Sequence, residues 1–182
     1  MFKYEIDENI ELRSFLTVDA SDLFNLTDCN RDALQEWLPW IYKTNEIKDT
    51  ELFIHHALEQ EAAKKGFFAA IYYQRKIAGV IDLHRISAEN RDAEVGYWLG
   101  KDFTGCGIMT KACAAIINYA FNTMQLNRLT LFAGTENAKS RAIAERLGFQ
   151  LEGTQRQAEW VHDHFIDLAL YGLLAKEWQD KK

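Results

Sequence analysis

The residues with the clearest chemical meaning lie where a predicted strand runs into a predicted helix, in the segment Leu99-Gly100-Lys101-Asp102-Phe103-Thr104-Gly105-Cys106-Gly107-Ile108-Met109. The first amide groups of a helix have no partner inside the helix, and the helix dipole makes that end partly positive. Glycine lets the main chain approach an anion closely. The segment therefore predicts a cradle in which main-chain N–H groups hold a phosphate. On the glycines alone, a simple turn between strand and helix is an equal alternative.

The elements that must position this segment follow from hydrophobic periodicity and from turn residues. The strongest helical stripe runs from Met109 to Phe121. A second helix is predicted over 49–65, with Asp49 or Thr50 as its cap and Gly66 at its end. The other predicted helices are one or two short ones from Asp19 to about Leu38, ending near Pro39, and one from Asn137 to Leu147 that ends at Gly148. The predicted strands are Ile10–Phe15, Phe67–Tyr73, Ile77–His84, Ala93–Leu99, Arg128–Ala133, Gln150–Trp160 and His164–Leu174.

This order of elements predicts an α+β, or mixed α/β, fold. Most consecutive strands can pair as an antiparallel meander, with the helices added on its faces. The strand–helix–strand unit from Ala93 to Ala133 is the exception, because a helical crossover places two strands side by side in parallel. We find no repeat, linker or abrupt change of composition, and we therefore predict a single domain over residues 1–182.

Composition excludes several classes of protein. The net charge of -6 and the acidic pI oppose general binding to nucleic acid, which needs clustered Lys and Arg. No apolar run approaches the roughly 18 residues that a membrane helix needs, and the first residues lack the pattern of a signal peptide. We therefore expect no membrane association and a cytoplasmic location. Three cysteines without CxxC spacing predict reduced thiols and no metal site.

The glycine segment resembles the acetyl-CoA-binding motif of the GCN5-related N-acetyltransferase (GNAT) superfamily, usually written Q/R-x-x-G-x-G/A. In that alignment Thr104 occupies the Gln/Arg place, Gly107 the central glycine and Met109 the final small residue. Its Gly-x-Gly-Ile-Met-Thr form is similar to the RimJ/RimL-like branch, whose members modify the N-termini of ribosomal proteins.

Three further segments resemble the same branch in the same order. The strand before the loop, Asp92-Ala93-Glu94-Val95-Gly96-Tyr97-Trp98-Leu99, is similar to a Glu-Val/Ile-Gly-Tyr-Trp-Leu pattern. The next helix carries Asn137 and Ser140, followed by Gly148-Phe149. The C-terminal pattern EGxxRxAxxxxxxxxDxxxY matches from Glu152 through Asp167 to Tyr171. The resemblance implies a mostly antiparallel twisted sheet of about seven strands with helices on both faces.

The resemblance also implies roles for individual residues. Main-chain groups of Trp98 and Leu99 would pair with the pantetheine arm of acetyl-CoA and polarise its thioester carbonyl. Asn137 would bind the pantetheine, Ser140 would donate a proton near the sulfur, and Glu159 would act as general base. The pyrophosphate would lie against the segment Thr104, Gly105, Cys106, Gly107, Ile108 and Met109.

Each of these side chains has a structural alternative. Asn137 could simply cap its helix, Ser140 could be a small packing residue, and Glu159 could be an outward-facing strand carboxylate. Glu94 is a rival base and Tyr171 a rival proton donor, although a core tyrosine is an equal interpretation. His162 and His164 would share one side of a strand, without an evident third metal ligand. The aromatic residues Trp37, Trp40 and Tyr42 would line the acceptor cleft, or else make a core or dimer contact.

The resulting prediction is an acetyl-CoA-dependent N-acetyltransferase that transfers the acetyl group directly to an amine. A protein N-terminal α-amine is the leading acceptor, because its pKa of about 8 leaves part of it neutral at pH 7. The alternatives are a small-molecule amine such as a polyamine or antibiotic, and a non-catalytic acyl-CoA-binding module. The sequence leaves the oligomeric state open, with a homodimer as one alternative.

Overall fold

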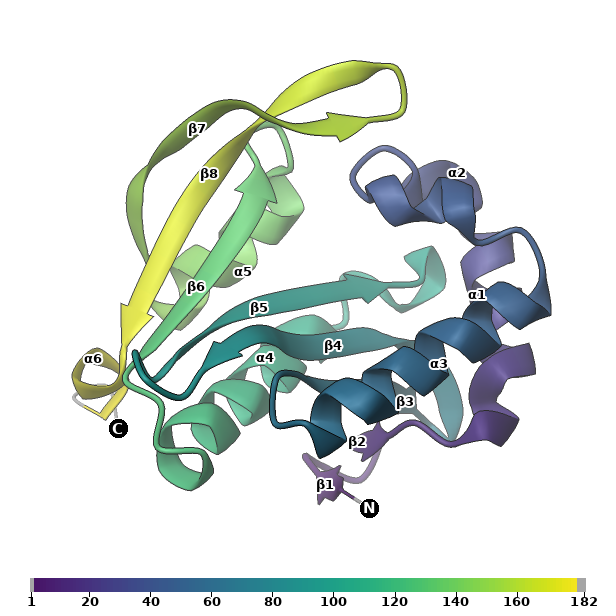
Figure 1. The fold of residues 1–182 in the computed structure, drawn as a ribbon, viewed down its shortest axis with the longest axis horizontal. Helices are drawn as coiled ribbons and strands as arrows, with labels where there is room; N and C mark the ends of the chain where they lie inside the picture. Colours follow the sequence, from purple (N-terminus) through teal and green to yellow (C-terminus); the bar gives the residue numbers. More distant parts are fainter. Residues whose placement is uncertain (1, 180–182) are drawn as a thin grey trace.

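The computed structural model describes residues 2–179 and folds them into one eight-stranded sheet with helices on both faces (Figure 1). The strand order is β1-β2-β3-β4-β5-β6-β8-β7, and every neighbouring pair is antiparallel except β5 with β6. The strands are β1 (Lys3–Glu5), β2 (Ile10–Ser14), β3 (Phe67–Tyr73), β4 (Lys76–Ser87), β5 (Asp92–Leu99), β6 (Arg128–Gly134), β7 (Gln150–Val161) and β8 (His164–Leu174). The α-helices are α1 (Ala20–Cys29), α2 (Arg31–Leu34), α3 (Ile47–Ala62), α4 (Ile108–Asn118), α5 (Ala138–Leu147) and α6 (Ala175–Gln179).

The predicted mixed α/β fold and its parallel crossover are confirmed. The sheet has one strand more than the seven expected, because β1 adds a three-residue pairing to β2. All three residues of β1 are exposed, so this strand lacks the alternation that marks a half-buried strand in sequence. Pro39 begins a short 3-10 helix (Pro39–Lys43) rather than closing the helical region.

The ends predicted for the helix over 49–65 are corrected. Helix α3 begins at Ile47, with Glu46 as its N-cap residue. Asp49 stands inside the first turn and accepts hydrogen bonds from the main-chain N–H groups of Asn45 and Glu46, at 2.8 and 3.0 Å. The helix ends at Ala62, before Lys64 takes a φ of 56°, so it stops short of Gly66. Asp49 is therefore the third residue of the helix, and its carboxylate stabilises the helix start from there instead of acting as the N-cap residue.

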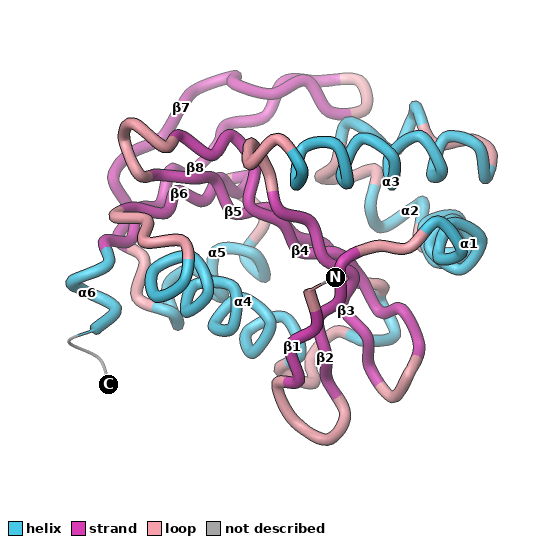
Figure 2. Tube along the Cα trace, turned by 60° about the horizontal axis from the view of Figure 1, so that its bottom comes forward, coloured by secondary structure: helices cyan, strands magenta, loops and turns pink. Residues whose placement is uncertain are grey.

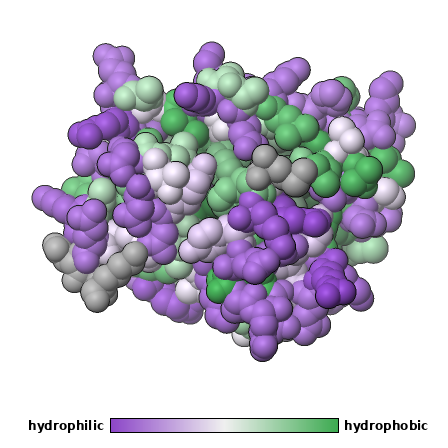
Figure 3. Space-filling view, turned by 90° about the horizontal axis from the view of Figure 1, so that it is seen from below, coloured by the Kyte–Doolittle hydropathy of each residue, from purple (hydrophilic) through white to green (hydrophobic). Residues whose placement is uncertain are grey.

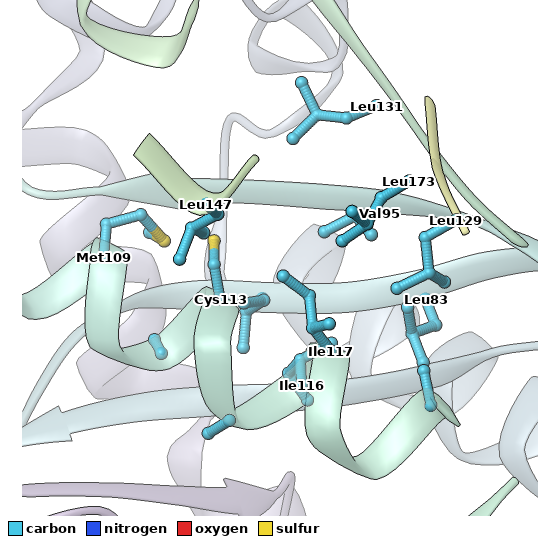
Figure 4. Close-up of a cluster of buried hydrophobic side chains, with 14 of the residues drawn as sticks. Leu83, Val95, Met109, Cys113, Ile116, Ile117, Leu129, Leu131, Leu147 and Leu173 are labelled. Carbon is cyan, nitrogen blue, oxygen red and sulfur yellow. The ribbon is translucent and has the colours of Figure 1, made fainter. Parts of the chain in front are cut away.

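The helices form two layers around the sheet. Helices α1 and α3 cover one face, and α4 and α5 cover the other (Figures 1 and 2). The apolar stripe of α4 points at the sheet: Met109, Cys113, Ile116 and Ile117 meet strand residues such as Val95 and Leu129, and Leu147 of α5 joins them (Figure 4). Hydrophilic side chains cover most of the face seen from below, with hydrophobic ones between them (Figure 3). Burial of this stripe fixes the start of α4 and the loop before it.

Strands β5 and β6 separate soon after they start. Their parallel ladder covers three residue pairs, from Asp92 with Arg128 to Glu94 with Thr130. Figure 1 shows the two strands diverging beyond this point. The edge of β5 that faces β6 is therefore without a strand partner from Val95 onward in the described chain. The end of this open edge leads into the glycine segment. Within residues 2–179, no helix combines the length and hydrophobicity needed to cross a membrane.

Candidate active site

The glycine segment forms an open cradle at the start of α4. Gly105 and Gly107 have φ values of 81° and 74°, the left-handed region that favours glycine, and Gly107 is the N-cap residue of α4. A Cβ atom at either glycine would meet nothing within 4 Å, so the backbone is accessible. The side chains of Ile108 and Met109 are buried and anchor the first turn, whose amide groups have no partner within the helix. These features together suit an anionic group.

Side chains of the loop add little to the cradle. The Thr104 hydroxyl donates to the carbonyl of Lys101 at 2.7 Å, and Cys106 is exposed. Arg146 of α5 donates to the Thr110 hydroxyl at 2.8 Å, which joins the first turn of α4 to the neighbouring helix. The polar groups that this segment leaves accessible are therefore mainly main-chain groups.

The main chain of β5 presents alternate residues to its open edge. The N–H group of Gly100 donates to the carbonyl of Ala78 at 2.8 Å, which sets the hydrogen-bonded pairs between β4 and β5 at every second residue. By this alternation the main-chain groups of Trp98 face β4, whereas those of Tyr97 and Leu99 face the open edge. The indole of Trp98 packs near Trp40, with ring centroids 5.9 Å apart. The free main-chain groups of this strand thus belong to Tyr97 and Leu99 rather than to Trp98.

Helix α5 brings Asn137 and Ser140 beside this edge. Asn137 is the N-cap residue, and its Oδ1 atom accepts a hydrogen bond from the main-chain N–H group of Ser140 at 3.1 Å. The capping role considered from the sequence is therefore present, and it leaves the Nδ2 amide group of Asn137 outside this bond. The Ser140 Oγ atom lies 3.1 Å from the Tyr97 hydroxyl, so the Ser140 side chain makes a polar contact with β5.

Glu159 lies on β7, opposite Ile166 of β8. Three residues, from Arg156 to Ala158, bulge out of the ladder just before it. Burial raises the pKa of the Glu159 carboxyl above its usual value. A raised pKa brings a carboxylate closer to the range in which it can take a proton from an amine, directly or through water.

Glu94, the alternative base, and Tyr171, the alternative proton donor, make other contacts. Glu94 accepts one hydrogen bond from Arg85 at 2.8 Å and contacts His84 at 3.1 Å. Tyr171 is fully buried, donates its hydroxyl hydrogen to Glu145 at 2.8 Å and accepts from Arg141 at 3.0 Å. Tyr171 is thus the core tyrosine with a satisfied hydroxyl that the sequence allowed.

An extended groove separates the segment after α1 from the β7–β8 hairpin. One cavity of about 610 Å³ lies between Trp37 on one side and Phe165 and Ile166 on the other. A second, of about 500 Å³, is lined by Trp40, Tyr42 and Trp160, and both cavities share His162. Figure 1 shows the tip of the hairpin reaching toward α2. The predicted aromatic cluster therefore lines this groove; we call the two cavities together the acceptor groove, after the role that we propose for it.

The histidines of the hairpin are placed differently from the prediction. His162 stands in the turn between β7 and β8 with a φ of 56°, and it contacts the Tyr42 hydroxyl through Nδ1 at 2.5 Å. His164 begins β8 and contacts Asp163. The pair does not alternate along one strand, because the turn intervenes. No group of three candidate metal ligands occurs among residues 2–179.

Comparison with known proteins identifies the family. A profile of the acetyltransferase (GNAT) domain matches residues 9–150. The chain belongs to this family. It is 38% identical over 184 aligned positions to the putative ribosomal N-acetyltransferase YdaF of Bacillus subtilis, covering 100% of both chains. It is 31% identical to the ribosomal-protein-serine acetyltransferase of Escherichia coli, covering 92% of this chain and 93% of the relative.

Solved structures of GNAT enzymes share the fold closely. The RimL ribosomal L7/L12 alpha-N-protein acetyltransferase in complex with coenzyme A superposes with a TM-score of 0.94 at 25% identity, covering 97% of this chain and 99% of that one. The microcin C7 self-immunity acetyltransferase MccE, in complex with acetyl-CoA and AMP, gives a TM-score of 0.89 at 30% identity, covering 93% and 94%. This protein is therefore a RimL-like GNAT N-acetyltransferase, and acetyl-CoA or CoA is bound in structures similar to it.

Sequence reasoning missed two contacts of this GNAT site. Tyr97 shares a core-facing side of β5 with Val95 and Leu99, and a polar tip on such a side needs a partner. Arg141 follows Ser140 directly and donates to the carbonyl of Thr135 at 2.9 Å, which ties the start of α5 to the end of β6. Neither pairing has a signal in local sequence, because the partners come from different elements.

Proposed function

We propose that this acetyltransferase transfers the acetyl group of acetyl-CoA directly to the α-amino group at a protein N-terminus. The extended acceptor groove carries this proposal. A single cavity of 300–1,000 Å³ is typical for one small ligand, and here two cavities of about 610 and 500 Å³ adjoin at His162. An extended peptide fills both cavities, with its first residue toward the open edge of β5. Relatives named as ribosomal-protein acetyltransferases support the same acceptor class.

On the donor side, the proposal assigns the pyrophosphate of acetyl-CoA to the main-chain amides from Gly105 to Met109. The free main-chain groups of Tyr97 and Leu99 pair with the pantetheine, and the Asn137 amide donates to it. Support comes from the left-handed glycines, from the unpaired first turn of α4 and from the absence of a strand partner on this edge of β5 in the described chain.

The proposed chemistry uses two side chains. The neutral amine attacks the thioester carbon, and its proton passes to Glu159 or to water. The C–S bond breaks as the C–N bond forms, and Ser140 donates a proton to the leaving sulfur. An α-amine with a pKa near 8 needs only modest help, so positioning and proton transfer supply the rate.

A small cationic amine is the second candidate acceptor. The larger cavity is lined by the carboxylates of Asp32, Glu36 and Glu136, which favour a positively charged ligand. Such a ligand needs only that cavity, whereas a peptide also contacts Trp40 and Trp160 in the smaller one.

The test measures thiol release from acetyl-CoA with three acceptors: a peptide with a free N-terminus, the same peptide with a blocked N-terminus but a free lysine, and spermidine. We expect the free N-terminal peptide to be acetylated most efficiently, and mass spectrometry to locate the acetyl group on its α-amine. Preference for spermidine would favour the small-amine alternative. Binding of acetyl-CoA without amine-dependent thiol release would contradict both.

A further inference from the structure

Tyr97 connects the strand that borders the donor site to the first turn of α5. Its hydroxyl lies 3.1 Å from the Ser140 Oγ atom and 3.2 Å from the Ser140 carbonyl oxygen. The Tyr97 ring packs on the core cluster beneath α4, together with Val95 and Leu99 of the same strand. A rigid aromatic side chain therefore holds its polar tip against the residue to which we assign proton donation.

Ser140 is restrained at both its main chain and its side chain. The Asn137 Oδ1 atom accepts from its N–H group at 3.1 Å, and Tyr97 contacts its hydroxyl. Only the two hydroxyl hydrogens remain free to rearrange. In one arrangement Tyr97 donates to the Ser140 carbonyl while Ser140 donates to Tyr97. In the other, Tyr97 donates to Ser140 Oγ, and the Ser140 hydrogen is free for a ligand.

Burial raises the pKa of the Tyr97 hydroxyl above its usual value, and a nearby Cys113 adds to the effect. The hydroxyl therefore keeps its proton throughout the neutral range and remains a hydrogen-bond donor. Because the Tyr97 hydroxyl stays protonated, it can donate to Ser140 Oγ. This is the second arrangement, in which the Ser140 hydrogen points toward the reacting group.

We propose that Tyr97 is a positioning residue that orients the Ser140 hydroxyl toward the sulfur leaving group. This inference rests on the role proposed above for Ser140. As the C–S bond breaks, the Ser140 hydroxyl proton passes to the sulfur, and the Tyr97 O–H donates a hydrogen bond to the serine oxygen left behind. Water returns to that oxygen the proton that the attacking amine released, so the transfer is balanced and Tyr97 orients and stabilises without a net loss of its own proton.

The first test is Tyr97→Phe, which removes the hydroxyl and keeps the ring. We expect kcat to fall about tenfold, the scale of one net hydrogen bond, with the Kd for CoA and the acceptor KM within about twofold of wild type. Proton transfer to sulfur then limits the rate more strongly, so the solvent deuterium isotope effect on kcat increases. The matched control is Tyr119→Phe, another tyrosine that packs on the same core cluster, between Phe2 and Phe67.

The second test is the double variant Tyr97→Phe/Ser140→Ala. If Tyr97 acts through Ser140, the double variant is no slower than Ser140→Ala alone. Multiplied effects of the two substitutions would overturn the inference, as would an unchanged kcat in Tyr97→Phe or a fall equal to that of Tyr119→Phe. Full turnover by Ser140→Ala would also overturn it, whereas acetylation of the free N-terminal peptide in that variant would leave the proposed acceptor intact.

Discussion

The proposed donor side of the site, from the Gly105–Met109 cradle to Ser140, and the proposed acceptor groove differ in how their parts are joined. The cradle uses main-chain groups of one continuous segment, and the start of α5 is linked to β5 by Tyr97. The groove is lined by side chains from distant parts of the sequence: Tyr42 contacts His162, 120 positions away. A site built from main-chain groups requires residues such as glycine at fixed positions, whereas many different sequences can supply the side chains that line a groove. The donor side is therefore the part that leaves recognisable motifs.

Glu159→Gln is the substitution with the largest expected effect, because it removes the proposed base. We expect kcat/KM to fall about 100-fold or more at neutral pH. In the wild-type enzyme kcat/KM falls as the pH drops through the raised pKa of Glu159, and the variant loses this acidic limb. A pH profile of both enzymes measures it.

The free energy of unfolding distinguishes the loss of the proposed base from misfolding of the Glu159→Gln variant. A carboxyl whose pKa is raised by folding favours the folded state at low pH, and that contribution is lost as the pH rises through the raised pKa. Charged Glu159 thus opposes folding at neutral pH, so the Gln variant should keep its free energy of unfolding. The control is Glu152→Gln on the same strand, where the ion pair with Arg128 lowers the pKa. Equal losses of activity in the two variants would contradict a special role for Glu159.

Gly107→Val tests the donor side alone. A β-branched residue at a φ of 74° is strained by roughly 1–3 kcal/mol, and relief of that strain displaces the amides of the cradle. We expect CoA affinity, measured by calorimetry, to fall about 10- to 100-fold, with the acceptor KM little changed. Gly153→Val is the matched control, because a Cβ atom there also meets nothing within 4 Å and its backbone is not left-handed. Equal CoA affinity in the two variants would refute this placement of the pyrophosphate.

What the sequence could predict follows the same division. The periodicity of α4 and the paired glycines specify a helix and its N-terminal loop locally, so the start of the helix is predicted to within one residue. The predicted start of α3 is wrong because Asp49 stabilises the helix from within its first turn. Residue spacing alone does not distinguish that position from the N-cap position. The last two strands are predicted to within one residue, and their ends leave His162 in the turn between them, so the expectation that His162 and His164 share one strand is wrong. The groove itself depends on how the hairpin packs against the segment after α1, which is a property of the whole fold.

Tyr42→Phe is the smallest predicted change, and it tests the acceptor groove alone. The Tyr42 hydroxyl contacts His162 Nδ1 at 2.5 Å across the groove, and the two rings stack with centroids 5.8 Å apart. Both side chains are exposed, so the loss of this bond should raise the acceptor KM only about two- to threefold. The increase should appear with peptides long enough to reach the second cavity and vanish with shorter ones, while CoA affinity stays constant. Tyr4→Phe, an exposed tyrosine on β1, is the control. If peptide length makes no difference, the second cavity is not part of the acceptor site, and the groove then fits a small amine better than a protein N-terminus.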